Sequence, residues 1–353
     1  MKQRWRTTPI RALAIVLTIV MANGTTKAQV SADELMVQRT LPAVARISGY
    51  LRSAATENKF HKHGESSGFF FDQGGLLLTV YSVYVKPETR RLCEKFEVDL
   101  FDDRSLNARI VAIDPFLDIA ILEMLEAGAY PLLPISSAPE AAASETVWAI
   151  AGRKAANEAY VFSGRVQAKD DNSLYQRGIG GRLIDVFIEF PDYAYGGPLV
   201  NRQGGVLGIN MILSQADSSA KVQPGERHAV PIKDIASIYK VLVANPVFEQ
   251  SWLGIDIRLL TMAERALVNE ISQQRGGVFV EFAWHDGPAA KLGVRRGDII
   301  IGMDGERVAT TTDFKRLLYG AENDTQMEVK IIRDNQIIRE QIRVEKRPPW
   351  AAI

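Results

Sequence analysis

Hydrophobic positions give the first half of the chain a β-type pattern. From about residue 44 to residue 210 the apolar residues come in short runs, which clusters of Gly, Pro, Asn and Asp separate. Short apolar runs between turn residues are typical of strands, and many of them without alternating helices indicate a β-barrel or β-sandwich. The runs that predict strands are residues 67–71, 76–81, 96–101, 119–124, 146–151, 183–190 and 206–213.

Helical patterns stand at three places outside this region. A capping-box pattern from Ser31 to Glu34 predicts the start of a short helix, and residues 232–243 predict a longer helix that ends before Pro246. A linker is expected at residues 244–251. From residue 252 to about 346 the pattern mixes both types, with a helix at 312–319 and strands at 278–282, 298–303, 327–333 and 337–344. Near 95 residues of mixed α and β content are enough for a small separate domain.

The N-terminal residues have the organisation of a secretory signal. Residues 1–11 carry four basic side chains and no acid, residues 12–22 are apolar apart from one threonine, and Thr26-Lys27-Ala28 fits a cleavage site. The apolar stretch is shorter than the roughly 20 residues that cross a bilayer. We therefore expect a signal peptide at 1–28 and export to a periplasm, with an uncleaved membrane anchor as the alternative.

Composition narrows the function classes. The chain has 353 residues with 42 basic and 42 acidic side chains, a length typical of two or three domains. Cleavage after Ala28 removes five basic residues and no acid, which leaves 37 basic residues against 42 acidic ones and a net charge of −5. An acidic exported protein is a poor candidate for nucleic-acid binding. The single cysteine, Cys93, excludes an internal disulfide, and we expect no chemistry from it.

Several motifs carry a resemblance to a known family. Ser67-Gly68-Phe69 before Leu76–Thr79, Asp114-Pro115 before Asp118–Leu122, and Gly196-Gly197-Pro198 before Gly205–Asn210 resemble, in order and spacing, the trypsin-like domain of the HtrA/Deg serine proteases. Trp252-Leu253-Gly254-Ile255, Gly287-Pro288 and Gly297-Asp298 resemble that family's PDZ domain. The resemblance implies a mainly β chain, with a double β-barrel trypsin-like domain at 29–243 followed by an α+β PDZ domain at 252–347. It implies no cofactor.

The resemblance also implies a Ser-His-Asp triad, and two of its three positions are altered. The aspartate position is Asp118, the histidine position holds Ser82, and the nucleophile position holds Tyr195. Tyr193 replaces a glycine of the oxyanion hole. A serine hydroxyl cannot take a nucleophile's proton as imidazole does, and a phenol is a weak, bulky nucleophile when no base lies beside it. We therefore expect a catalytically degenerate member, in which Ser82 and Asp118 are neighbours.

Rescue of catalysis by other residues is the alternative. Ser66 or Ser67 is a candidate nucleophile, with His61 or His63 as its only evident base, and both serines are expected to precede a strand. His61 and His63 share one face of an extended segment, which is a weak metal pattern without a third ligand, so no metal site is predicted. His228 is expected to be a satisfied core residue, and His285, next to Asp286, a surface residue.

The PDZ part retains its expected binding features. PDZ domains bind a C-terminal peptide as an added strand, while loop amides hold its carboxylate. The candidate peptide-binding residues are Trp252, Leu253, Gly254, Ile255, Ile257, Phe314, Leu317 and Leu318, several of which are alternatively core. The first hypothesis is an exported pseudoprotease that acts as an adaptor, scaffold or chaperone for proteins or peptides with free C-termini. The alternatives are an active endopeptidase and a regulatory subunit of an active HtrA-type protease, in a homotrimer or a mixed oligomer.

Overall fold

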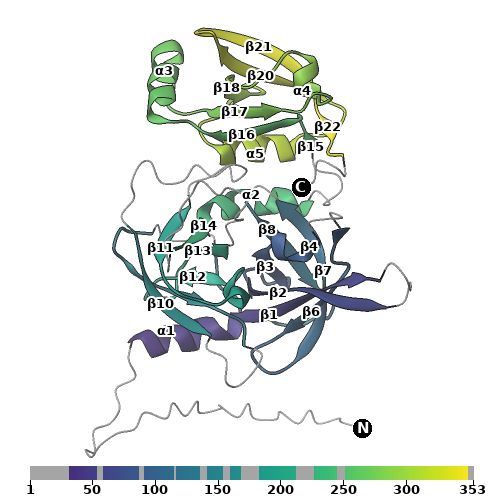
Figure 1. Ribbon diagram of the computed structural model, residues 1–353, viewed down its shortest axis with the longest axis vertical. Helices are drawn as coiled ribbons and strands as arrows, with labels where there is room; N and C mark the ends of the chain where they lie inside the picture. The colour runs from purple at the N-terminus through teal and green to yellow at the C-terminus, as the bar shows by residue number, and fades with distance from the viewer. Residues whose placement is uncertain are drawn as a thin grey trace, which may run out of the picture. The chain divides into compact units, whose positions relative to one another are not determined.

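Two closed β-barrels form the first part of the molecule (Figure 1). The computed structural model describes residues 32–53, 59–86, 91–114, 117–135, 141–153, 160–167, 183–211, 226–244 and 251–348. The expected signal peptide lies outside these ranges, as do Pro115, Phe116 and most of the expected linker. Contacts join the barrels and the sheet that follows them into one unit that begins at Ala32.

The first barrel closes in the order β1-β2-β3-β8-β7-β6. Its apolar residues point inward with period two, so that Phe96 and Val98 of β6 are buried while Lys95 and Glu97 are partly exposed. The strands are β1 (Val44–Arg52), β2 (Phe60–Phe70), β3 (Leu76–Val80), β6 (Lys95–Asp99), β7 (Ser105–Asp114) and β8 (Ile119–Met124). A two-stranded ribbon of β4 (Val85–Lys86) and β5 (Arg91–Leu92) accompanies them.

The second barrel closes in the order β10-β11-β14-β13-β12-β9. Its strands are β9 (Thr146–Ile150), β10 (Val161–Val166), β11 (Ile184–Phe187), β12 (Pro198–Val200), β13 (Val206–Met211) and β14 (Glu226–Pro231). The helix predicted at 232–243 is confirmed as α2 (Ile232–Ala244), and it buries Ile232, Ile235, Ile238 and Leu242. The helix predicted near the capping pattern is α1 (Ala32–Thr40). Three 3-10 turns complete this part, η1 (Leu41–Ala43), η2 (Ser82–Tyr84) and η3 (Asp192–Ala194).

The C-terminal part is an antiparallel sheet with three helices. Strands β16-β17-β18-β20-β21 are hydrogen-bonded in that order, β19 pairs with β18, and β15 pairs with β22. The strands are β15 (Ser251–Trp252), β16 (Ile255–Leu259), β17 (Val278–Ala283), β18 (Ile299–Met303), β19 (Glu306–Arg307), β20 (Gln326–Arg333), β21 (Gln336–Arg343) and β22 (Glu345–Lys346). The helices are α3 (Met262–Ser272), α4 (Pro288–Lys291) and α5 (Thr311–Gly320).

The fold confirms the expected mainly β architecture, a double barrel followed by an α+β sheet. Capping boxes fix the starts of two helices, because Thr261 and Glu264 satisfy each other's backbone amides in α3 as Thr310 and Asp313 do in α5. The part of the chain that is described contains no helix with the length and apolarity needed to cross a membrane.

Candidate functional site

Ser82 and Asp118 form a hydrogen-bonded pair, as the sequence predicts. The Ser82 amide donates to Asp118 Oδ1 at 2.7 Å, and the Ser82 hydroxyl donates to Oδ2 at 3.0 Å. Adjacent strand ends bring them together, because β3 ends two residues before Ser82 and β8 begins one residue after Asp118. Asp118 has a left-handed φ of 52°, and its carbonyl accepts the amide of Tyr81 at 3.1 Å. The carboxylate is thus held by the residues that follow β3.

Burial changes the protonation of Asp118. Removal from water raises the pKa of this carboxyl to about 7, although the hydrogen bonds from Ser82 and Tyr81 act in the opposite direction. Near neutral pH this carboxyl is therefore protonated in a large fraction of the molecules. Its described side-chain partner is a hydroxyl, which is neither basic nor acidic at that pH. The pair can hold the loop, but it offers no imidazole to accept a proton.

Tyr195 is packed as a structural residue. Its ring meets Phe190 edge to face, with 5.5 Å between the ring centres, and burial raises the pKa of its phenol. Its amide donates to the Asp192 carbonyl at 3.1 Å, which closes η3, so this N–H is directed into its own turn. Within the described residues, no hydrogen bond joins the Tyr195 hydroxyl to Ser82 or Asp118.

The prediction that Ser66 and Ser67 precede a strand is wrong, since both lie inside β2 and are fully buried. The Ser66 hydroxyl contacts the Thr79 hydroxyl at 2.9 Å and the Tyr84 hydroxyl at 2.5 Å. The pairing of β2 with β1 and β3 buries this stretch, a long-range effect that local spacing does not reveal. A serine held in this way has no described histidine beside its hydroxyl.

Ser67 instead joins the two barrels. Its hydroxyl donates to the Tyr193 carbonyl at 2.5 Å and accepts the Gly152 amide at 2.8 Å, and its own amide donates to the Tyr195 carbonyl at 2.8 Å. Ser67 belongs to the first barrel, whereas its three partners belong to the second. Three hydrogen bonds of Ser67 therefore hold the two barrels together next to Tyr195, the expected nucleophile position.

Arg46 is part of the same junction and escaped the sequence analysis. Its side chain is almost fully buried, with Nε donating to the Gly152 carbonyl at 2.9 Å and Nη1 to Glu65 at 2.5 Å. The guanidinium carbon lies 4.1 Å from the centre of the Tyr193 ring. The sequence does contain a signal for this residue, a lone arginine in the apolar run from Val44 to Ile47. A charged side chain within a buried strand needs partners that compensate its charge, so such an arginine indicates a specific polar contact.

Within the described residues, none of the four histidines forms a hydrogen bond with Ser66, Ser67 or Ser82. His61 is exposed on β2 and His63 is half-buried, and no cluster of metal-ligating side chains is present in the described ranges. His228 is buried and contacts Asp185 through Nδ1 at 2.7 Å, while His285 contacts Asp286 at 3.0 Å on the surface. His285 lies on the surface as expected, whereas the expectation of a satisfied His228 is met only at Nδ1, because its buried Nε2 has no described hydrogen-bond partner.

The candidate peptide-binding residues gather around one small cavity. Trp252, Leu253, Ile255, Ile257, Phe314 and Leu318 line it, together with Ser251, Lys315, Tyr319 and Arg347. Its volume of about 20 Å³ suits a water molecule and is too small for a peptide side chain. Leu317 is not among the lining residues and packs, half-buried, against the core. The groove between β16 and α5 is thus closed, and its candidate apolar residues are buried.

Gly254 meets a strict backbone requirement next to this cavity. Its φ is +75°, and an added Cβ would lie 2.6 Å from the Gly287 Cα. The flanking carbonyls are paired, since Leu253 accepts the Ala289 amide at 2.9 Å and Gly254 accepts the Trp284 amide at 2.8 Å. Because a side chain at this position would displace the loop, a Gly254 variant cannot report on peptide binding alone.

Lys315 adds a charged contact that the sequence did not reveal. This residue of α5 is almost fully buried, and its ammonium lies 3.3 Å from Asp114 Oδ2 at the end of β7. Burial lowers the pKa of Lys315, while the two carboxylates of Asp114 and Asp234 raise it. Asp114 also accepts the Leu117 amide through Oδ1 at 3.2 Å.

Comparison with known proteins identifies two domains in the chain. A trypsin-like peptidase domain matches residues 66–209, and a PDZ domain matches residues 251–344. A Pseudomonas fulva protein named as a DegP-like periplasmic serine endoprotease is 28% identical over 269 residues, covering 76% of this chain. The chain spans 53% of the length of that relative.

Solved structures share the fold. A serine endoprotease from Yersinia pestis superposes with a TM-score of 0.58 at 22% identity, covering 91% of this chain and 99% of the other. The HtrA-type protease AlgW, solved with a decapeptide, gives a TM-score of 0.58 at 21% identity, covering 89% and 98%. The chain thus has a trypsin-like peptidase domain followed by a PDZ domain, and it is similar to proteases named as HtrA-type or DegP-like.

Proposed function

We propose that this protein is an exported HtrA-type pseudoprotease that binds peptides through its PDZ domain. The observation that carries the proposal is the site at the barrel junction. There Asp118 is paired with Ser82 instead of an imidazole, and the Tyr195 amide closes its own turn. Without a base and a free nucleophile, acyl transfer loses several orders of magnitude in rate.

Peptide binding is supported by the groove residues and requires the groove to open. A cavity of about 20 Å³ does not admit a side chain, so β16 and α5 must separate before an extended peptide can pair with β16. A relative of the same fold was solved with a decapeptide, which favours the same use here. Because only open molecules can bind the peptide, the apparent affinity is the affinity of the open form multiplied by the fraction of molecules that are open.

Peptide binding is tested with fluorescent decapeptides on the full protein. The same peptides are offered with a free C-terminal carboxylate and with an amide, and we expect the amide to bind at least about tenfold more weakly. Phe314→Ala enlarges the cavity and is expected to shift the preference toward a larger terminal side chain. Leu317→Ala on the same helix is the control, because Leu317 does not line the cavity.

Equal binding of both peptide forms, or identical effects of the two variants, would refute the groove as the binding site. Circular dichroism confirms that each variant folds, since a buried Phe→Ala change costs about 3 kcal/mol of stability.

The competing function is an active endopeptidase, which the names of the relatives favour. A serine-directed fluorophosphonate distinguishes the two. We expect no covalent label on the full protein and no cleavage of an unfolded substrate, while an active HtrA-type protease is labelled under the same conditions. A label that Ser66→Ala or Ser67→Ala removes would establish catalysis by a serine of β2.

Localisation and assembly complete the proposal. We propose a periplasmic protein, because residues 1–28 have the pattern of a secretory signal and relatives are named as periplasmic. Cell fractionation followed by mass determination is expected to find the protein in the periplasm with its N-terminus at Gln29. Co-purification with an active HtrA-type partner would establish the regulatory-subunit alternative, and light scattering would distinguish a homotrimer.

A further inference from the structure

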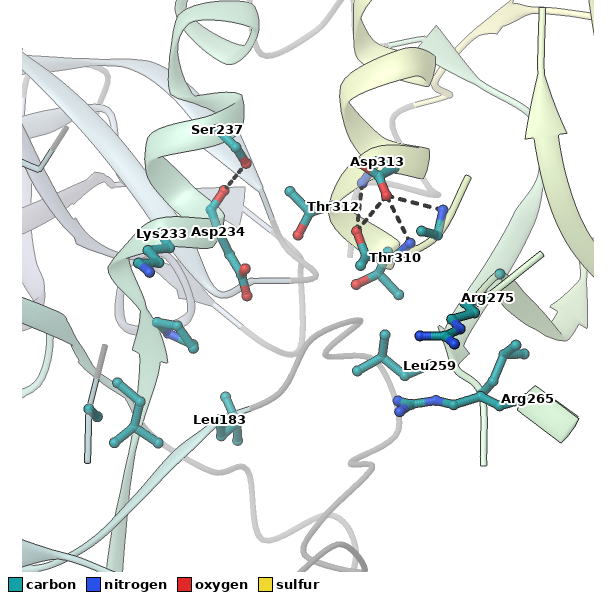
Figure 2. A pocket seen from close by; sticks show the side chains of 18 of the residues that line it. Leu183, Lys233, Asp234, Ser237, Leu259, Arg265, Arg275, Thr310, Thr312 and Asp313 are labelled. Carbon is teal, nitrogen blue, oxygen red and sulfur yellow. Dashed lines mark hydrogen bonds between the residues drawn. The ribbon is translucent and has the colours of Figure 1, made fainter. Parts of the chain in front are cut away.

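A second, much larger cavity lies apart from the peptide groove (Figure 2). Its volume is about 1000 Å³, which is at the upper end of the range for ligand sites. One wall comes from β11, β14 and the start of α2, and the other from the end of β16, from α3 with the loop after it, and from the start of α5. The two cavities share no lining residue.

Two arginines supply positive charge on one wall. Arg265 belongs to α3 and Arg275 to the loop that follows it, and Figure 2 shows both side chains reaching into the cavity beside Leu259. Neither guanidinium forms an ion pair or a side-chain hydrogen bond with a described residue. Other arginines of this part do have carboxylate partners, as Arg258 does with Glu264 at 2.8 Å. The pair is therefore available for an external anion.

The acids of the cavity form no ion pair with these arginines within the described residues. Asp313 is used by the start of α5, since its Oδ2 accepts the Ala309 amide at 3.1 Å and the Thr310 amide at 3.0 Å. Asp234 stands on the opposite wall in Figure 2, and burial raises the pKa of its carboxyl, while Lys315 and a hydrogen bond from Thr312 lower it.

Apolar side chains complete the lining. Leu183 and Leu207 lie on the barrel wall, and Leu259 and Ala266 lie beside the arginines. A phosphate ion would fill a small part of about 1000 Å³ and would leave these apolar surfaces exposed. A peptide segment with alternating carboxylate and apolar side chains satisfies both the charge and the apolar surface.

We propose that this cavity is a second peptide site, which binds an acidic, partly apolar segment through carboxylates on Arg265 and Arg275. The site does not depend on the PDZ groove or on a free C-terminus. It would let the protein hold a client at an internal segment, separately from its C-terminal residues.

The probe is a fluorescent decapeptide of alternating Glu and Leu, acetylated and amidated so that it has no terminal carboxylate. We expect anisotropy to show binding to the full protein. The double variant Arg265→Gln/Arg275→Gln should weaken it about tenfold or more. The control double variant Lys240→Gln/Arg307→Gln removes the same charge from exposed positions outside the cavity and should leave binding unchanged.

Four outcomes would overturn the proposal. Equal binding of a Gln–Leu peptide would mean that carboxylates are not recognised, and equal losses in both double variants would mean unspecific attraction. Full competition by millimolar inorganic phosphate would assign the arginines to a small anion. Loss of binding in Phe314→Ala would place the probe in the PDZ groove, whereas retention in that variant supports a separate site.

Discussion

At the scale of single residues, Asp118 is held firmly by hydrogen bonds, yet its carboxyl titrates far from the usual range of an aspartate. The carboxyl is fixed by two hydrogen bonds from Ser82, and it lies in a left-handed backbone conformation. With a hydroxyl as its side-chain partner, however, no positive charge balances the desolvated carboxylate. Burial therefore dominates, and the pKa rises to about 7.

Replacement of Asp118 by Asn is expected to remove one component of the pH dependence of stability. The folded carboxyl holds a proton between about pH 4 and about pH 7, where the unfolded carboxyl has lost it. Its contribution to the free energy of unfolding is therefore present below about pH 4 and is lost as pH rises through about 7. Urea titrations should show the wild type gaining stability relative to Asp118→Asn as the pH falls.

The amide is a suitable control group, because it can accept the Ser82 amide and donate to the Ser82 hydroxyl without carrying charge. A stability difference between the two proteins that stays constant across this range would contradict the elevated pKa.

Arg46→Lys is expected to destabilise the protein although it keeps the charge. The lysine cannot reproduce the paired contacts to the Gly152 carbonyl and Glu65 or the stacking on Tyr193. We expect a loss of about 2 kcal/mol in the free energy of unfolding, measured by urea denaturation. Arg52→Lys on the same strand, with an exposed side chain, should lose less than about 0.5 kcal/mol.

At the scale of elements, sequence patterns predicted the strands with continuous apolar runs and the helices α2 and α5. They missed β7, where exposed residues such as Asn107 and Arg109 interrupt the run, and the polar first half of β2, which is extended because it pairs with β1. Helix α3 was missed as well, although Thr261 and Glu264 carried its capping signal. Only Val268 of that helix is buried, so its apolar periodicity is weak.

Site prediction succeeded where the resemblance to the HtrA/Deg proteases supplied the neighbours and failed where packing specific to this chain decided. Ser82 and Asp118 were expected to be neighbours from their positions in that resemblance, and the pairing of β3 with β8 brings them together. Closure of the groove could not be predicted, since it depends on how closely Phe314 of α5 approaches Ile255 of β16. The burial of Lys315 also depends on tertiary packing, because its ammonium lies beside Asp114 of β7.

Helix α5 offers a test of that buried charge. Lys315→Met leaves Asp114 without this ammonium, and we expect a loss of about 3 kcal/mol in the free energy of unfolding. The double variant Lys315→Met/Asp114→Asn should recover most of the loss, because the amide oxygen can still accept the Leu117 amide. If urea denaturation shows additive losses in the double variant, the ion pair is not the source of the effect.

At the scale of the whole molecule, the two proposed peptide sites differ in charge and in accessibility. The peptide groove is closed and apolar, whereas the large cavity is accessible and carries two arginines. Their salt dependence should differ accordingly. We expect the affinity for the blocked Glu–Leu peptide to fall as sodium chloride is raised from about 0.05 to 0.5 M, because salt screens exposed charges.

Binding of the free-carboxylate peptides should be less sensitive, because backbone pairing and apolar burial contribute most of the affinity there. Parallel anisotropy titrations at each salt concentration provide the measurement. Equal slopes for the two probes would contradict the assignment of separate sites.

The hydrogen bonds of Ser67 have a further consequence for how the two barrels move. The Ser67 and Gly152 amides both donate across the boundary between the two barrels. Those two amides should exchange with deuterium only when the barrels come apart, and so at the slow rate of global unfolding. Slow exchange of both amides would show that the two barrels unfold together as one cooperative unit, and faster exchange would show that they separate on their own.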